Sequence, residues 1–240
     1  MLSHSFEDLA QTFRVLIEAQ FKLGQLITID RPEAVGNIET SVNAMLNAFS
    51  NLYDLMQQEL DSPVDWYATP ELCVVLAIRN ARHHNNANRI RTIYNYHVQN
   101  SSSPTDTSKY FYVNFPANPN EEGGGFFDVG IYLGGFITTV LDMPRSQSRL
   151  RSSARELIRN YLNADQFEAD AAAADLTNED ILINFVPLAT NAGIALSPYI
   201  REHIQAASTE ATAFLSHFEN VAPAITQSHD SEEIDFMLPS

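Results

Sequence analysis

The chain has 240 residues, of which 45% are hydrophobic, and this content is enough for a real core and excludes a globally disordered chain. Its formal net charge is −16, which argues against a protein that binds nucleic acid over its whole surface, because affinity for phosphate comes from lysine and arginine. The one cysteine, Cys73, excludes an internal disulfide and is expected to pack as a small hydrophobic side chain.

The N-terminus and the apolar stretches predict a cytoplasmic protein without a membrane anchor. The chain starts with Glu7 and Asp8 close to its N-terminus instead of a basic segment followed by an apolar run, so no secretory signal is expected. The longest apolar stretch, 126–143, contains Asp128 and Asp142 and suits a buried segment better than a membrane helix. A single thiol also suits a reducing compartment.

Helical patterning dominates the first hundred residues. Apolar residues at helical spacing predict a helix over about 5–27 and a long second helix over about 31–60. A threonine before Pro70 and a glutamate after it combine a cap, a proline suited to the first helical position and an early acid, so a third helix should begin there. Its first two turns are apolar on every side, which predicts a central position. A kink or short break is expected in the asparagine-rich stretch 85–88, with helix continuing to about His97.

The second half of the chain mixes a short β segment with further helices. Residues 110–115 are rich in aromatic residues and valine and predict a strand, followed by a polar loop over 116–125. The run 126–133 could pair back as a hairpin or open a helix. Helices are expected over 146–163, 164–174, 178–190 and 197–220.

These elements predict a mainly α protein. Its first unit is a helical bundle over 1–143, which could include a short β-hairpin near 110–133. A helical C-terminal extension follows over 144–220, and a loosely held acidic tail occupies 221–240.

Positive charge is concentrated in two segments. From Leu72 to Thr105 the chain has no aspartate or glutamate, and a second arginine cluster follows over 145–159. Beyond residue 160 the balance reverses, with Arg201 alone against 13 acids. This asymmetry predicts a local anion site on an acidic body. The arginines of the two segments are Arg79, Arg82, Arg89 and Arg91, and Arg145, Arg149, Arg151, Arg155 and Arg159.

The first segment contains the most informative stretch of the chain. Seven apolar residues that begin at Leu72 run into Arg79 and Asn80, and His83 and His84 follow. An arginine at the end of a buried run needs a partner or a function, because arginine is rarely buried unless it is paired. On a regular helix Arg79 lies roughly 40° from His83 and roughly 140° from His84. Helix geometry therefore pairs Arg79 with His83, whereas an irregular turn at the asparagines would bring His84 closer.

An arginine beside a histidine suits cleavage of an RNA phosphodiester, with no metal and no cofactor required. The imidazole can take the proton of a ribose 2′-hydroxyl near neutral pH, and the guanidinium can stabilise charge that grows on the phosphoryl oxygens. Asn80 could orient the imidazole or donate to the phosphate. Three arginines could follow the RNA backbone, and two tyrosines could stack on bases. These side chains are Arg82, Arg89 and Arg91, and Tyr94 and Tyr96.

The residues from Arg79 to His84 resemble the Arg-x4-6-His signature of HEPN (higher eukaryotes and prokaryotes nucleotide-binding) domains. Many members carry a polar residue, often asparagine, after the arginine, and place the motif at the end of a hydrophobic helix in a helical bundle. The resemblance extends to His97 and implies an HEPN-like bundle with Arg79 and His84 as the catalytic pair and Asn80 as the polar second position. His83 falls one residue short of the family spacing and stays the rival catalytic histidine.

HEPN domains typically dimerise, so that two copies of the motif form one metal-independent ribonuclease site, and many act as toxins or phage-defence effectors. The resemblance therefore implies an endoribonuclease that cleaves RNA as a homodimer, with a cognate inhibitor or a defence complex as a further partner. Toxins silenced by a nucleotidyltransferase usually carry a tyrosine two places after the histidine. This chain has Asn86 there and departs from that subgroup.

Three other interpretations stay open. Arg79 could form a buried ion pair with Asp54 or Glu59 of the second helix. The arginines of 145–159 could form a solvated helix face, an RNA groove or a surface for an acidic partner. In the last case the protein would be a non-catalytic helical interaction subunit of a defence or toxin–antitoxin complex.

Overall fold

Helices make up most of this protein, whose computed structural model describes residues 1–61, 63–83, 89–103, 105–117, 129–144 and 150–239. They contain 62% of the described residues, which confirms the prediction of a mainly α protein. The helices are α1 (Leu2–Leu26), α2 (Arg31–Glu59), α3 (Pro70–His83), α4 (Ile93–Asn100), the π-helix η1 (Ile137–Leu141), α6 (Ser152–Leu162), α7 (Ala164–Ala173), α8 (Phe185–His203) and α9 (Thr209–Asn220).

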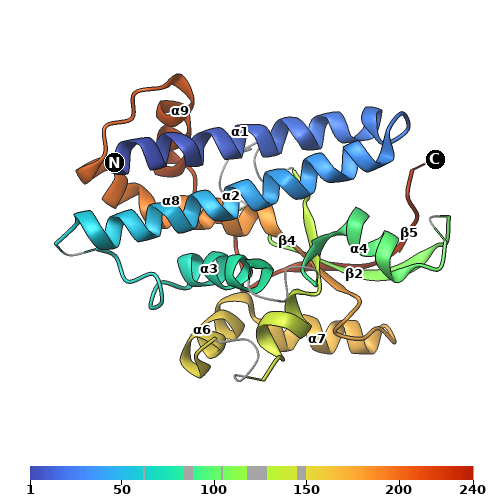
Figure 1. Ribbon diagram of the computed structural model, residues 1–240. Coiled ribbons are helices and arrows are strands. Elements are labelled where there is room, and N and C mark those ends of the chain that lie inside the picture. Colours follow the sequence, from blue (N-terminus) through green and yellow to red (C-terminus); the bar gives the residue numbers. More distant parts are fainter. Residues whose placement is uncertain (62, 84–88, 104, 118–128, 145–149, 240) are drawn as a thin grey trace.

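The two longest helices, α1 and α2, pair along their length as an antiparallel hairpin (Figure 1). α9 packs against α1, and α3 packs against α2 and α8. Both long helices and the start of α3 at Pro70 agree with the expected positions, because local signals define their ends. In α2 the signal is explicit: Oδ1 of Asp30 accepts the N–H of Glu33 at 3.0 Å, and a proline occupies the first turn.

The cap of α2 leads to a first prediction. Asp30→Ala removes the acceptor of the Glu33 N–H and should lower the free energy of unfolding by about 1 kcal/mol. Urea unfolding followed by circular dichroism measures the change. Asp54→Ala is the matched control, because Asp54 is exposed within the same helix and alanine there improves helix propensity. Equal losses from the two variants would contradict a capping role for Asp30.

The strands of the described part of the chain form one mixed sheet in the order β1-β3-β4-β2-β5. β2 pairs with β4 in parallel and with β5 in antiparallel orientation, while β3 pairs with β1 and β4 in antiparallel orientation. The hairpin expected near 110–133 is wrong, because β4 lies between β2 and β3 and separates them. The strands are β1 (Arg91–Thr92), β2 (Ser108–Asn114), β3 (Tyr132–Gly134), β4 (Ile181–Asn184) and β5 (Asp230–Phe236).

Three helical predictions also need correction. The range 178–190, expected to be one helix, contains strand β4 and the start of α8, and the residues of β4 are all buried. The reason is that a short apolar run cannot be assigned to a helix or a strand by its period alone. The helix expected over 197–220 is two helices, the end of α8 and all of α9. The continuation of α3 to about His97 is replaced by β1 and a separate α4. The stretch 84–88, where a kink was expected, and residues 118–128 lie outside the described residues.

The acidic tail is an ordered part of the sheet, so the prediction that it is loosely held is wrong. Every residue of β5 is in register with a residue of β2. Ile234 and Phe236 pack against the small cluster around Tyr110, while Glu233 contacts Lys109 across the strands. Apolar and acidic residues alternate at this end of β5, so its apolar side chains share one face and pack against the sheet cluster. The sheet takes strands from each of the ranges 1–143, 144–220 and 221–240.

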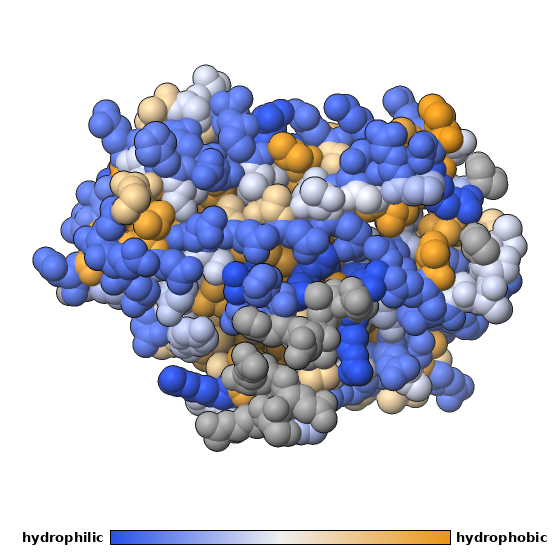
Figure 2. Space-filling view, viewed as in Figure 1, coloured by the Kyte–Doolittle hydropathy of each residue, from blue (hydrophilic) through white to orange (hydrophobic). Residues whose placement is uncertain are grey.

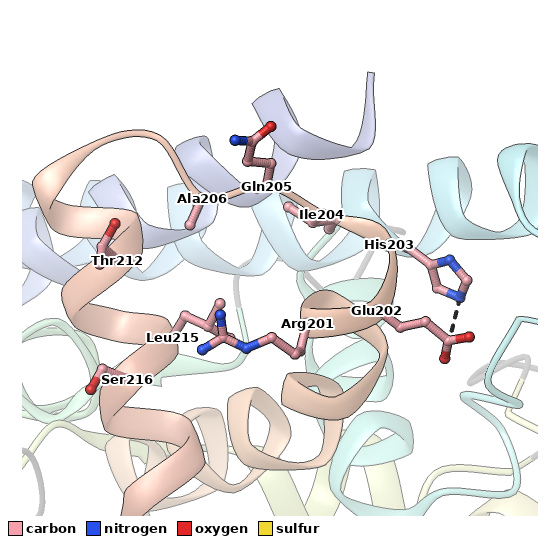
Figure 3. Close-up of a pocket in the computed structure, with 9 residues that line it drawn as sticks. All are labelled: Arg201, Glu202, His203, Ile204, Gln205, Ala206, Thr212, Leu215 and Ser216. Atoms are coloured by element: carbon pink, nitrogen blue, oxygen red, sulfur yellow. Dashed lines mark ion pairs between the residues drawn. The ribbon is translucent and has the colours of Figure 1, made fainter.

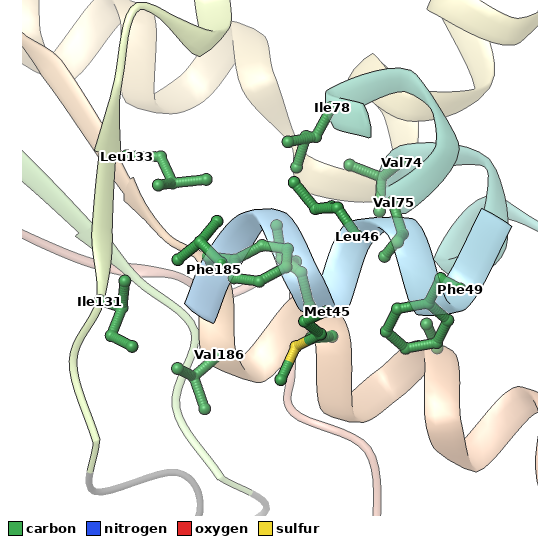
Figure 4. Packing of buried hydrophobic residues seen from close by; sticks show 14 of the residues in the cluster. Met45, Leu46, Phe49, Val74, Val75, Ile78, Ile131, Leu133, Phe185 and Val186 are labelled. Atoms are coloured by element: carbon green, nitrogen blue, oxygen red, sulfur yellow. The ribbon is translucent and has the colours of Figure 1, made fainter. Parts of the chain in front are cut away.

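The main core lies where α2, α3, α8 and the sheet meet, as Figure 4 shows from close by. α2 lies in the middle of this view, with α3 on one side and β3 on the other. Because α3 is apolar on all sides, it can contact α2, α6 and α8 at once, as its central position requires. The labelled core residues are Met45, Leu46, Phe49, Val74, Val75, Ile78, Ile131, Leu133, Phe185 and Val186.

Candidate functional site

A pocket of about 250 Å³ lies between α2 and the C-terminal end of α3. Each helix contributes a triplet at positions i, i+3 and i+4, which share one face of a helix. The two triplets therefore face each other across the pocket. The lining residues are Asn43, Leu46 and Asn47 from α2, and Arg79, Arg82 and His83 from α3.

The lining is cationic and amidic although the protein is strongly acidic. The chain has 30 aspartates and glutamates and a net charge of −16, yet no carboxylate lines this pocket in the described part of the chain. Figure 2 shows strongly hydrophilic side chains gathered below α2 on this face of the molecule. A pocket with this lining favours an anion over a cation or a neutral apolar ligand.

Arg79 is half-buried at the edge of the core. Its Nη1 donates to Oδ1 of Asn80 at 3.2 Å, and its Nε is buried without a hydrogen-bond partner among the described residues. The alternative in which Arg79 pairs with Asp54 or Glu59 gains no support: Glu59 lies 3.6 Å from the amino group of Met1 instead. Within the described residues Arg79 makes no ion pair, so its positive charge is available to the pocket.

The structural ion pair belongs to Arg82. Arg82 is 7% exposed, and its Nη2 donates to Oε2 of Glu39 at 2.5 Å. Its Nε donates to Oδ1 of Asn43 at 2.8 Å, and its Nη1 donates to the carbonyl oxygen of Ile90 at 2.7 Å. The prediction that Arg82 follows an RNA backbone is therefore corrected. All three nitrogens of its guanidinium donate to internal acceptors, and these hydrogen bonds join α3 to α2 and to the segment before β1.

The remaining predicted residues occupy different surroundings. His83 is exposed and lines the pocket with Arg79, as helix geometry predicts, whereas His84 lies outside the described residues. Arg89 is exposed in a turn. Arg91 is half-buried and donates to Oδ1 of Asn95 at 2.9 Å, and burial lowers its pKa. The structure thus brings Arg79 and His83 together and leaves Arg89 and Arg91 outside the pocket lining.

The tyrosines expected to stack on bases belong to α4 and pack against residues of the sheet. Tyr94 lies edge-on to Phe236, with ring centroids 5.6 Å apart. The hydroxyl of Tyr96 donates to the carbonyl oxygen of Glu179, and burial raises the pKa of Tyr96 to about 12. Neither ring lines the pocket between α2 and α3.

Three functional positions escaped sequence reasoning, and all three lie on α2. Asn43 and Asn47 line the pocket, and Glu39 holds Arg82. The weak signal available is chemical: asparagine is a poor helix former, and Asn43, Asn47 and Asn51 stand at successive turns of one face of α2. Nothing in the sequence links this turn of α2 to the end of α3.

A larger hollow of about 610 Å³ lies between the end of α8 and α9, but its arginine is already paired with a carboxylate. Figure 3 shows Arg201 lying across this gap, with His203 turned towards Glu202. Nε and Nη2 of Arg201 donate to the two carboxylate oxygens of Glu219 at 2.7 and 2.5 Å. This neutralised guanidinium makes the hollow a weaker candidate than the pocket between α2 and α3.

The second arginine cluster is partly neutralised as well. Arg159 contacts Asp165 and Glu168 of α7 at 2.6 and 2.7 Å, and it lies 3.5 Å from Asp142. Arg155 donates to the carbonyl oxygen of Met143. Arg145 and Arg149 lie outside the described residues. The contacts of Arg159 with two acids of α7 and with Asp142 explain its position. They do not require an RNA groove.

Comparison of the chain with protein-family models, with curated proteins and with solved structures finds no match. The resemblance to HEPN domains therefore rests on the sequence alone, on residues 79–84 and the apolar run before them. Among the helices described, none is long and apolar enough to cross a membrane.

Proposed function

We propose that this protein is a metal-independent endoribonuclease, with the pocket between α2 and α3 as its substrate-binding site. The single observation that supports the proposal is that Arg79 and His83 line one pocket to which none of the described residues contributes a carboxylate, on a chain of net charge −16. Among the described residues Arg79 forms no ion pair, so its guanidinium can donate to an anion bound in this pocket.

The chemistry needs one group that takes a proton and one that gives it. A neutral imidazole takes the proton of a ribose 2′-hydroxyl, the 2′-oxygen forms a bond to phosphorus, and the bond from phosphorus to the 5′-oxygen breaks. The leaving oxygen takes a proton from a second imidazolium, which yields a 2′,3′-cyclic phosphate and a 5′-hydroxyl. His83 or His84 is the histidine, and a second copy of the chain supplies the second one. Arg79 stabilises the phosphoryl oxygens, and Asn80 orients Arg79.

The biological part of the proposal follows from the resemblance. A cytoplasmic toxin or phage-defence effector would use such a site against cellular or phage RNA. A cognate inhibitor or a defence complex would then control it. Each of these statements depends on ribonuclease activity, which is the point to test.

The deciding experiment follows a fluorescent structured RNA incubated with purified protein in EDTA. We expect Arg79→Ala to slow cleavage by about 100-fold or more, as loss of a group that stabilises charge in the transition state does. We expect one of His83→Ala and His84→Ala to have a comparable effect, which identifies the catalytic histidine. Products should end in a 2′,3′-cyclic phosphate, and a 2′-deoxy substitution at the cut site should prevent cleavage.

Matched controls lie in the hollow between α8 and α9. Arg201→Ala and His203→Ala remove the same side-chain types outside the proposed site and should leave cleavage unchanged. Cleavage that survives Arg79→Ala and both histidine substitutions would remove the proposal. RNA binding without turnover by the unaltered protein would support a non-catalytic helical interaction subunit instead.

A further inference from the structure

Asn43 presents its amide to the pocket in a fixed orientation, and we infer that its Nδ2 donates to a phosphate oxygen of the bound RNA. In the same inference Arg82 and Glu39 are positioning residues that hold this amide. The inference rests on the proposed ribonuclease function and adds a substrate-binding residue and its support to it.

The orientation follows from which atom of Asn43 is already bonded. Oδ1 of Asn43 accepts Nε of Arg82 at 2.8 Å, so this end of the planar amide is tied to α3. Nδ2 is the other end of the same plane, and the exposed Asn43 side chain lines the pocket to which Arg79 also contributes. A carboxamide nitrogen offers two donors and no acceptor. A neutral donor next to a guanidinium suits a phosphodiester oxygen.

The support behind Asn43 is rigid and buried. Arg82 is 7% exposed, and its Nη2 and Nη1 are held by Glu39 and by the carbonyl oxygen of Ile90 at 2.5 and 2.7 Å. Oε1 of Glu39 accepts both the N–H and the hydroxyl of Thr92, at 2.7 and 2.8 Å. Glu39 and Asn43 are one helical turn apart on α2, so both contact the same guanidinium. Donors held in place before substrate arrives need no reorganisation when it binds.

Asn47 provides an internal comparison. It lines the same pocket one turn further along α2 and is exposed like Asn43. In the described part of the chain its side chain forms no hydrogen bond that would orient the amide. The two asparagines therefore share a pocket and an exposed side chain, and among the described contacts only Asn43 has its amide held in one orientation.

The test measures binding of a 2′-O-methyl oligoribonucleotide, which keeps the phosphates but lacks the attacking hydroxyl. Asn43→Asp preserves the acceptor for Arg82 and strengthens that bond through charge, so the melting temperature should stay unchanged or rise. It replaces the Nδ2 donor by a carboxylate oxygen, and Asn47→Asp introduces the same charge into the same pocket. We expect Asn43→Asp to weaken binding by about tenfold more than Asn47→Asp, the range of a hydrogen bond to a charged group.

Asn43→Ala keeps the inference testable if the aspartate variant folds poorly. It removes the amide without adding charge and should weaken binding more than Asn47→Ala does. Arg82→Lys tests the positioning role, because lysine can pair with Glu39 but has no Nε to hold Asn43. We expect Arg82→Lys to weaken binding in the unaltered protein and to have no further effect in the Asn43→Ala background.

The outcomes separate the two proposals. Equal losses at positions 43 and 47, or an equal effect of Arg82→Lys with and without Asn43, would overturn the inference and leave the ribonuclease proposal intact if Arg79→Ala still abolishes cleavage. Full cleavage by Arg79→Ala together with both histidine variants would overturn the ribonuclease function itself.

Discussion

Glu39→Ala should lower the free energy of unfolding by about 3–5 kcal/mol, because it leaves the charge of Arg82 buried without its carboxylate partner. The side chains of Arg82 and Glu39 are only 7% and 14% exposed. The substitution also removes the acceptor of the Thr92 N–H and hydroxyl, so the two hydrogen bonds that join β1 to Glu39 of α2 are lost. Domains of this kind are stable by about 5–15 kcal/mol in total, so the loss should be visible as a much lower urea midpoint.

The single tryptophan is a suitable reporter for this measurement. Trp66 is fully buried, and its fluorescence should shift when the chain unfolds. Arg201→Ala is the control, because it also breaks a bidentate arginine–carboxylate contact, but at the exposed surface where ion pairs contribute little. If Glu39→Ala were as stable as Arg201→Ala, the network around Arg82 would not contribute to the fold as we describe.

Phe13→Ala is the second substitution for which we expect a large effect, a loss of about 3–5 kcal/mol. Phe13 is 1% exposed, and its ring meets those of Phe49, Phe214 and Phe218 at centroid distances of 6.0, 5.3 and 5.4 Å. These rings come from α1, α2 and α9. Truncation should therefore leave a cavity at the point where three helices meet and loosen α9 in particular.

Phe21→Ala makes the same chemical change on the same helix. Phe21 is 74% exposed, so its truncation removes almost no buried surface and should leave the free energy of unfolding nearly unchanged. Thermal unfolding of both variants gives the comparison. A loss of similar size in Phe21→Ala would contradict the packing explanation, because alanine is the better helix former and the exposed ring buries almost no surface.

Local signals allowed the candidate site to be predicted in part. The spacing of Arg79 and His83 places both on one face of a helix, and the structure has both in one pocket. The assignment of roles to neighbouring arginines was less successful. Arg79 and Arg82 stand three residues apart in an acid-free segment, and the sequence offers no means to tell which of them meets a carboxylate. Glu39, far away in the chain, decides this.

The sheet shows the same limit. β4 and β5 are separated from β2 by long stretches of chain, and their pairing joins the centre of the sequence to its C-terminus. Periodicity alone favoured a helix over 178–190 and a loose tail from 221, because a short apolar run and an acidic segment carry no sign of their partners. Contact with β2 converts both into strands.

Caps and helical periodicity act between residues a few positions apart, so the order of amino acids was enough to place the long helices, the start of α3 and the cationic face at its end. The folded arrangement was needed to show that Arg82 joins α2 to α3, that Asn43 and Asn47 complete the pocket, and that β4 separates β2 from β3. Those outcomes depend on which distant surfaces come into contact, and burial free energy summed over the whole core selects among them.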